Sequence, residues 1–350
     1  MKTVIYGIGV LSVIVAGSVA AQDDARSSDS RTLIVTASNT TNNQLLIYNT
    51  KGALLKQIPT EGRGGVGGNA GGIAQNHDRL AVVNFGSGTV TVFAKERERA
   101  TLHVEQLIST ISSPVSVAFG HDHLYILTAT HVESHRIDRG GVHVTADGES
   151  SLVVGDGSAA QVGTLENQLI FSEKSNAIET VNLNGRGAIA GSATLVANIP
   201  SNVNAPFGLA TRGNDAYVTI AHADEISLVR HDAVLTVTGS GTQHAPCWVA
   251  LDGPFLFSAN SPSRSVSRYA VYGQRIIQDA AIVTTFSGNP TDITYHGGLA
   301  AVIDADGTNS HVSVFKVDGD GNFSLKGLAT INGVATNGVA IVRLDENADD

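Results

Sequence analysis

The sequence is short of cysteine, of basic charge and of long apolar stretches. It has one cysteine in 350 residues, Cys247, so no disulfide can form within the chain. A domain of this size must then be held together by its buried core. Lysine and arginine total 22 against 32 aspartates and glutamates, a formal net charge of −10. This acidic excess argues against nucleic acid or an anionic membrane as a partner.

The first residues have the order of a secretory signal peptide. Lys2 precedes an apolar run from about Val4 to Ala16, and small residues follow before the charges begin. This order is typical of cleaved signals, whereas a membrane anchor needs about 20 apolar residues. We therefore expect a signal peptide at residues 1–21, a flexible linker at 22–31 and a secreted or periplasmic protein that leaves the membrane after cleavage.

Seven short runs, each leading into an apolar strand, recur along the chain. Successive runs start 44, 45, 47, 40, 44 and 46 residues apart. Such a period is typical of one four-stranded propeller blade per repeat. The runs are NAGGIA from Asn69, SPVSVA from Ser113, SAAQVG from Ser158, APFGLA from Ala205, APCWVA from Ala245, NPTDIT from Asn289 and ATNGVA from Ala335.

The strands that follow each run favour an all-β propeller. An apolar strand and then an alternating one follow Ala245, at residues 255–260 and 265–270, as expected for antiparallel sheets with a buried second strand. The last run has only a short tail, and its missing strands lie at the start of the mature chain. The sequence thus predicts a seven-bladed β-propeller over residues 32–344, closed by its C-terminal strand joining the N-terminal blade, and an acidic tail at 345–350. Two β-sandwiches would not explain the period.

Residues 245–271, 71–94 and 289–321 resemble the lactonase-like seven-bladed β-propellers, the group of bacterial 6-phosphogluconolactonase and the fungal carboxymuconate cyclases. The resemblance implies an enzyme that hydrolyses or cyclises a small lactone or hydroxy acid in the central channel. We expect the protein to be a monomer. Where the cyclases carry a substrate-binding Arg and an acid–base Glu, this sequence has Cys247 and Asn260, which cannot take those roles. The alternative is a non-catalytic propeller that binds a glycan, peptide or protein on one face.

Propeller ligands gather where first strands begin and second strands end. A lactone hydrolase needs a base to activate water and donors to hold the developing oxyanion. The candidate bases at these positions are Glu173, His222, His244, Asp292 and Asp304. The candidate ligand-binding residues are Asn84, Asn204, Phe207, Trp248, Asn260 and Asn289. The alternative for each Asn or Asp is a turn cap, and for Glu173 it is a solvated pair with the next residue, Lys174.

No cofactor is expected. The His-x-His spacing of residues 121–123 suits zinc, but no third ligand joins it in sequence, and we interpret it as a solvated hairpin. A cation held by Asp304, Asp306 and Asn309 is an alternative on ligand type. The glycine-rich residues 63–72 lack a nucleotide-binding fingerprint and are interpreted as flexible backbone near the channel mouth.

Overall fold

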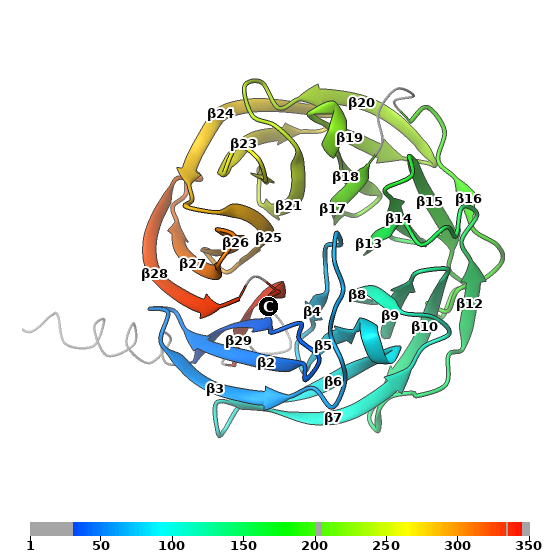
Figure 1. Cartoon of the computed structure of the whole chain (residues 1–350). Helices are drawn as coiled ribbons and strands as arrows, with labels where there is room; N and C mark the ends of the chain where they lie inside the picture. The colour runs from blue at the N-terminus through cyan, green and yellow to red at the C-terminus, as the bar shows by residue number, and fades with distance from the viewer. Residues whose placement is uncertain (1–30, 200–204, 334, 345–350) are drawn as a thin grey trace, which may run out of the picture.

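The chain folds into a ring of seven antiparallel β-sheets, or blades, around a common axis (Figure 1). The computed structural model describes residues 31–199, 205–333 and 335–344, and the structural statements below concern these ranges. The expected signal peptide, all but one residue of the expected linker and the acidic tail lie outside them. The prediction of an all-β, seven-bladed propeller is confirmed.

Each blade runs outward from the axis in chain order, except that blade 1 begins with the last strand. Blade 1 comprises β29 (Asn337–Arg343), β1 (Thr32–Ala37), β2 (Gln44–Asn49) and β3 (Leu54–Pro59), and blade 2 comprises β4 (Ile73–Gln75), β5 (Arg79–Asn84), β6 (Thr89–Glu96) and β7 (Thr101–Ser109). Blade 3 comprises β8 (Pro114–Gly120), β9 (His123–Thr128), β10 (His131–Asp138), β11 (Gly141–Val142) and β12 (Gly148–Ser151), and blade 4 comprises β13 (Ala159–Thr164), β14 (Gln168–Glu173), β15 (Ala177–Asn182) and β16 (Thr194–Leu195). Blade 5 comprises β17 (Pro206–Arg212), β18 (Asp215–Ile220), β19 (Glu225–Arg230) and β20 (Ala233–Gly239), and blade 6 comprises β21 (Pro246–Asp252), β22 (Phe255–Asn260), β23 (Ser265–Tyr272) and β24 (Arg275–Thr285). Blade 7 comprises β25 (Asn289–His296), β26 (Leu299–Ala305), β27 (Asn309–Val317) and β28 (Phe323–Asn332).

Blade 3 departs from the four-strand pattern, because its outer edge is divided between β11 and β12, which both pair with β10. Two short 3-10 helices, η1 (Phe85–Ser87) and η2 (Ala221–Ala223), follow the second strands of blades 2 and 5. The described residues contain no helix with the length and hydropathy that crossing a bilayer requires.

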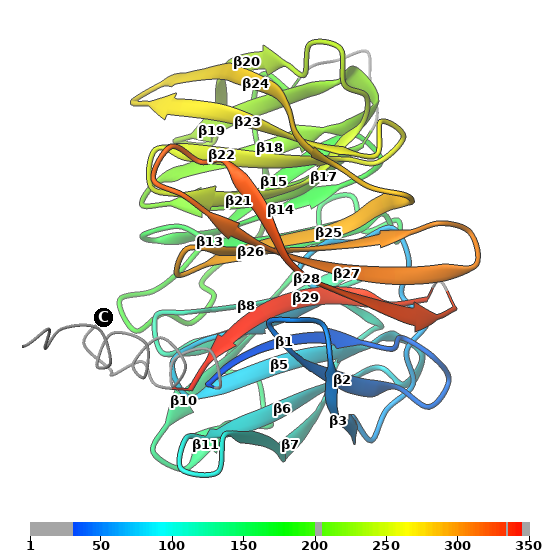
Figure 2. The same cartoon turned by 90° about the vertical axis from the view of Figure 1, so that its left-hand side faces the viewer.

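The ring is closed between the two ends of the described chain. Strand β29 pairs antiparallel with β1, placing Ile341 opposite Ile34 and Val342 opposite Leu33. All four side chains are buried, and Figure 2 shows β29 beside β1. The predicted closure is confirmed, and β29 covers the inner edge of β1, which would otherwise be unpaired.

A β-bulge recurs near the start of the innermost strands. In blades 6 and 7 the register shifts between Pro246 and Trp248 and between Pro290 and Asp292, and blades 3, 4 and 5 shift at the equivalent place. Proline is tolerated as the first residue of a strand. Because a bulge redirects the next side chain, it decides which residue of each recurring run faces the axis.

Candidate functional site

A cavity of about 210 Å³ lies on the axis, among the innermost strands. Gln161 of β13, Trp248 of β21 and Asp292 of β25 line it, together with Thr294 and Tyr295. The first three are each the first residue after the bulge of their strand. The recurring bulge therefore brings side chains from three blades to one cavity, which we call the channel cavity.

Asp292 supplies the carboxylic acid of the channel cavity. Its Oδ1 accepts the N–H of Ile293 (2.8 Å) and its Oδ2 accepts the N–H of Val339 in β29 (3.1 Å). Burial raises the pKa of Asp292 to about 7, although both N–H groups oppose the shift. An acid with a pKa near neutrality is suited to take up and release protons there.

The position of Asp292 also has a structural role. Gln161 Oε1 accepts the N–H of Leu209 (2.7 Å), and Ser116 Oγ accepts the N–H of Val162 (3.2 Å). In each case the residue after the bulge ties its own strand to the innermost strand of the next blade. Of these three hydrogen bonds between neighbouring innermost strands, the one in blade 7 is accepted by an acidic side chain, that of Asp292. The carboxyl group of Asp292 is therefore held firmly while it faces the channel cavity.

The glycine-rich segment 63–72 crosses the mouth of the channel where the innermost strands begin, and we call it the plug. Figure 1 shows this segment, between β3 and β4, reaching the middle of the ring. Asn69 anchors it, because its Nδ2 donates to Val115 O and its Oδ1 accepts from Asn337 Nδ2 (2.7 Å). Its backbone carbonyl accepts from the indole Nε1 of Trp248 (3.0 Å). The plug is thus fixed to blades 1, 3 and 6, whereas we predicted flexible backbone.

Lys174 secures another part of the plug. Its Nζ donates to the carbonyl oxygen of Gly68 (2.7 Å) and lies 6.0 Å from the centroid of the Phe207 ring. That ring packs edge-on against Trp248, with centroids 5.3 Å apart. No sequence pattern indicated this role for Lys174, because its partner is a backbone carbonyl more than two repeats earlier. Phe207 and Trp248, both predicted to bind a ligand, therefore lie together next to the plug.

The ends of the second strands do not face the channel. Each of the four predicted residues there is at most 1% exposed, and it lies between its own hairpin and the neighbouring blade. We expected these four residues to share one site with Asp292, and they do not. The direction of a side chain at the end of a strand is set by how that strand pairs with its neighbours. These four residues are Asn84, Glu173, Asn260 and Asp304.

Asn84 and Asn260 each complete a buried network of hydroxyl groups. Asn84 Nδ2 donates to Thr91 Oγ1 (2.8 Å), and its Oδ1 accepts from Thr60 Oγ1 of blade 1 (2.7 Å). Asn260 Nδ2 likewise donates to Ser267 Oγ (2.8 Å). Buried amides need such partners, so the geometry favours a structural role for both over ligand binding.

Asp304 forms a dyad with a histidine that the sequence did not single out. Its Oδ2 accepts the N–H of Gly288 (2.9 Å) and pairs with His311 Nδ1 (3.2 Å). In the following loop, Asp306 Oδ1 accepts the N–H of Thr308 (2.8 Å), as in an Asx turn, and also the N–H of Asn309 (2.8 Å). In the part of the chain that the structure describes, no three His, Cys, Asp or Glu side chains are grouped to hold a metal ion.

Glu173 is buried without the solvated pairing that was the alternative for it. Neither of its carboxylate oxygens makes a hydrogen bond to a described residue, and Lys174 points to the plug instead. Burial raises the pKa of Glu173 to about 7, helped by the charges of Glu179 and Asp156 and opposed by the Gly155 N–H and the charge of Lys174. Glu173 lies at the end of β14, outside the lining of the channel cavity.

The burial of Glu173 makes stability depend on pH. Its folded pKa of about 7 lies above the ordinary value of 4.5, so its neutral form contributes stability that is complete below about pH 4.5 and is lost as pH rises through about 7. We expect this contribution to be about 1 to 3 kcal/mol. Denaturant titrations from pH 4.5 to 8 should show a smaller fall for Glu173→Gln than for the wild type. The exposed control Glu98→Gln should keep the wild-type slope, and equal slopes in all three proteins would contradict the prediction.

The remaining predicted residues lie on the rim or outside the described ranges. His222, in η2, is exposed, and the His244 side chain is 68% exposed, with its Nδ1 2.8 Å from Asp224 Oδ2. Asn289 is also exposed at the start of β25. None of these three lines the channel cavity. Asn204 lies outside the described residues.

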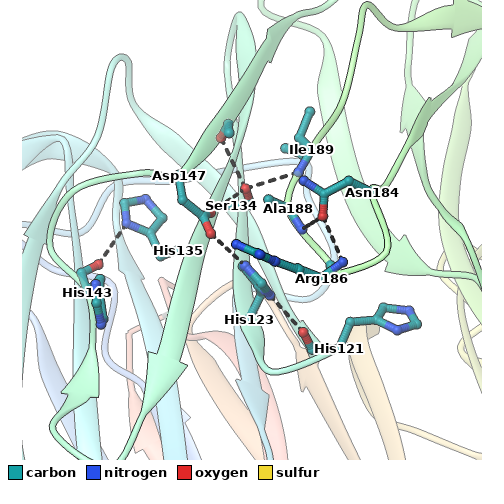
Figure 3. A network of polar contacts seen from close by, with 12 residues as sticks. His121, His123, Ser134, His135, His143, Asp147, Asn184, Arg186, Ala188 and Ile189 are labelled. Atoms are coloured by element: carbon teal, nitrogen blue, oxygen red, sulfur yellow. Dashed lines mark hydrogen bonds and ion pairs between the residues drawn. The ribbon is translucent and has the colours of Figure 1, made fainter.

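The two histidines of residues 121–123 differ in exposure. His123 is 1% exposed; its Nδ1 donates to the carbonyl oxygen of His121 (2.7 Å) and its Nε2 lies 2.8 Å from Asp147 Oδ2 (Figure 3). Ser134 donates to the other oxygen of Asp147 (2.8 Å) and accepts the N–H of Ile189 from blade 4 (3.2 Å). The prediction of a solvated hairpin is therefore wrong for His123, which joins a polar network between two blades.

Cys247 is the bulged residue of β21 and is half-buried. Burial raises the pKa of its thiol to about 12. Because the thiolate is the nucleophilic form, Cys247 is suited to packing rather than to nucleophilic attack.

Comparison with known proteins identifies the fold. No protein-family model matches the chain, and no curated protein is similar to it in sequence. The structure matches a periplasmic gluconolactonase of Pseudomonas aeruginosa with a TM-score of 0.63 at 14% identity, over 89% of this chain and 99% of that one. A candidate 6-phosphogluconolactonase of Bacteroides uniformis matches with a TM-score of 0.63 at 14% identity, over 89% and 100%. A virginiamycin B lyase from Staphylococcus aureus matches with a TM-score of 0.56 at 15% identity, over 78% and 92%. The fold is that of the lactonase-like seven-bladed propellers, in a divergent sequence.

Proposed function

We propose that this protein is an exported, monomeric lactonase-type hydrolase that opens a small lactone in the channel cavity. The observation that carries the proposal is Asp292, a firmly held carboxyl group with a pKa of about 7 that lines a cavity of about 210 Å³. The likeness of this protein's fold to that of a periplasmic gluconolactonase supports a lactone as the substrate class. The N-terminal sequence supports export.

The reaction uses Asp292 as a general base. Its ionised carboxylate takes a proton from a water molecule as the water oxygen attacks the carbonyl carbon of the lactone. The ring C–O bond then breaks, and the ring oxygen receives the proton from Asp292, which leaves an open-chain hydroxy acid. The Oε1 of Gln161 accepts the N–H of Leu209, which leaves the Nε2 of Gln161 free to donate. This Nε2 and the hydroxyl of Thr294 donate hydrogen bonds to the developing oxyanion.

The position of the plug determines access. It crosses the mouth where the innermost strands begin, so the substrate enters from the opposite mouth. Thr294 and Tyr295, near the end of β25, line the channel cavity on that side. This arrangement favours a small substrate without bulky substituents.

A panel of lactones tests the proposal. Protein recovered from the exported fraction of its host is incubated at pH 8 with five- and six-membered lactones, including sugar lactones, and the acid released is titrated. We expect saturable hydrolysis well above the uncatalysed rate for at least one small lactone. If every lactone opens only at the uncatalysed rate, the activity is rejected, and retention of the protein inside the cell rejects export.

A non-catalytic propeller that binds a glycan, peptide or protein is the second candidate. The observation that favours it is the dispersion of the candidate bases, because Glu173, His222, His244 and Asp304 all lie outside the channel cavity. Saturable binding of such a ligand, without turnover of any lactone, would favour this function over hydrolysis.

A further inference from the structure

A second cavity, of about 310 Å³, lies between blades 6 and 7, away from the axis. We call it the inter-blade pocket. Phe286, which follows β24, forms part of its wall, and His311, Ser313 and Phe315 project into it from β27. Asp304 lies behind His311. Neither the proposed reaction nor the channel cavity uses these residues.

The inter-blade pocket occupies a space that a glutamate side chain fills in blades 3 and 4. Ser313 pairs with Val302 of the second strand, as Glu179 pairs with Phe171 in blade 4. The Glu179 carboxylate fills the equivalent space and accepts the N–H of Val153 (2.8 Å) in the crossover from the preceding blade. Glu133 does the same in blade 3, where it accepts the N–H of Ile111 (2.7 Å). Ser313 is too short to fill this space as the two glutamates do, and the space is open in blade 7. Blades 5 and 6 also have a serine at this position, Ser227 and Ser267.

The polar side of the inter-blade pocket offers a hydrogen-bond acceptor. Asp304 Oδ2 lies 3.2 Å from His311 Nδ1, which fixes the proton of the neutral imidazole on Nδ1. The lone pair is then on Nε2, which lies 3.8 Å from Asp306 Oδ2, too far for a hydrogen bond. Ser313 adds a hydroxyl two residues along the same strand. A ligand hydroxyl fits this pair, because it donates to His311 Nε2 and accepts from Ser313 Oγ.

The remaining wall of the inter-blade pocket is apolar and partly aromatic. The rings of Phe286 and Phe315 meet edge to face, with centroids 6.1 Å apart. At the mouth, Leu325 and Leu328 of β28 are 63% and 51% exposed. Covering these side chains with an apolar ligand removes them from water, which is favourable. A dry cavity of about 150 Å³ is sufficient to hold a benzene ring.

We propose that the inter-blade pocket is a binding site for a small aromatic molecule that carries one hydroxyl group. The aromatic ring lies between the phenylalanines and the exposed leucines, and the hydroxyl group meets His311 and Ser313. Two nearby carboxylates, Asp304 and Asp306, disfavour an anionic ligand. This site is independent of lactone hydrolysis in the channel cavity.

The probe for the experiment is 4-fluorophenol, observed by fluorine NMR during titration with the full-length protein. We expect saturable binding to the wild type, and 4-fluorotoluene and 4-fluorobenzoate should each bind at least about tenfold more weakly, since they lack the hydroxyl group or add a charge. Ser313→Gln introduces a neutral side chain of the size that blades 3 and 4 accommodate, so it should fill the space and weaken 4-fluorophenol binding at least about tenfold.

Two control variants distinguish binding in the inter-blade pocket from binding elsewhere on the protein. Ser324→Gln makes the same exchange on the exposed face of β28, outside the pocket lining, and should leave the affinity within about twofold. Asp292→Asn in the channel cavity should also leave it unchanged. Ser313→Ala, which removes the hydroxyl that donates to the ligand without filling the pocket, gives a second test if Ser313→Gln does not fold, and should weaken binding. The proposal is overturned if the wild type does not bind 4-fluorophenol, if 4-fluorotoluene binds as tightly, or if neither pocket variant weakens binding.

Discussion

Replacing Asp292 with asparagine is expected to lower kcat/KM for a hydrolysed lactone by about 10²- to 10⁴-fold, the usual contribution of a general base. The amide cannot accept a proton from water. In the wild type, kcat/KM should rise with pH through about 7, the pKa of Asp292, and level off above it. The variant should lose this dependence, which initial rates measured from pH 5 to 9 would show.

A matched control separates catalysis from stability. Glu179 uses its two carboxylate oxygens to accept the N–H groups of Val153 and Val154, as Asp292 does with two N–H groups in blade 7. Glu179→Gln therefore loses the same kind of acceptor far from the channel cavity. It should keep the wild-type pH profile and rate. A similar loss of activity in both variants would mean that Asp292 acts only by holding the fold.

Replacing Trp248 with alanine is expected to lower the free energy of unfolding by about 3 to 5 kcal/mol, the usual cost of removing a large buried aromatic side chain. Trp248 is 8% exposed and packs against Phe207. Its indole N–H also holds the carbonyl of Asn69, so the plug should loosen. Denaturant titration measures the first effect. Hydrogen exchange at the Ala70 N–H, which donates to Ala160 O (3.1 Å), measures the second.

Trp248→Phe keeps an aromatic ring and removes the N–H. Trp248→Phe should lower the free energy of unfolding by about 0.5 to 1.5 kcal/mol, the net contribution of one hydrogen bond. The smaller size of the phenyl ring adds a smaller loss. If exchange at Ala70 stays as slow in Trp248→Ala as in the wild type, Trp248 does not hold the plug.

The fold was predictable because it repeats. Each blade is the same unit, so a run such as APCWVA marks an innermost strand wherever it recurs, and seven copies define the ring. The split seventh repeat also predicted the pairing of β29 with β1. The position of the second-strand ends was predictable for the same reason, since Asn84, Glu173, Asn260 and Asp304 do occupy equivalent places.

The site was less predictable because it depends on side-chain direction. One bulged residue reverses the faces of a strand, and nothing in the sequence shows that the residue after each bulge faces the axis. The burial of Glu173 depends on its neighbours in blades 3 and 4. The plug depends on contacts of Asn69 with three distant blades. Such long-range packing leaves no local pattern in the sequence.

The pairing of β29 with β1 also sets the order of events during biosynthesis. Strand β1 leaves the ribosome first among the described strands, and its inner partner leaves last. A contact between opposite ends of a chain is slow to form, because a long loop must be closed before the contact contributes. Until then the inner edge of β1 is free to pair with another chain. A chain truncated before Asn337 lacks β29, so the inner edge of its β1 would stay unpaired. We expect such a chain to aggregate.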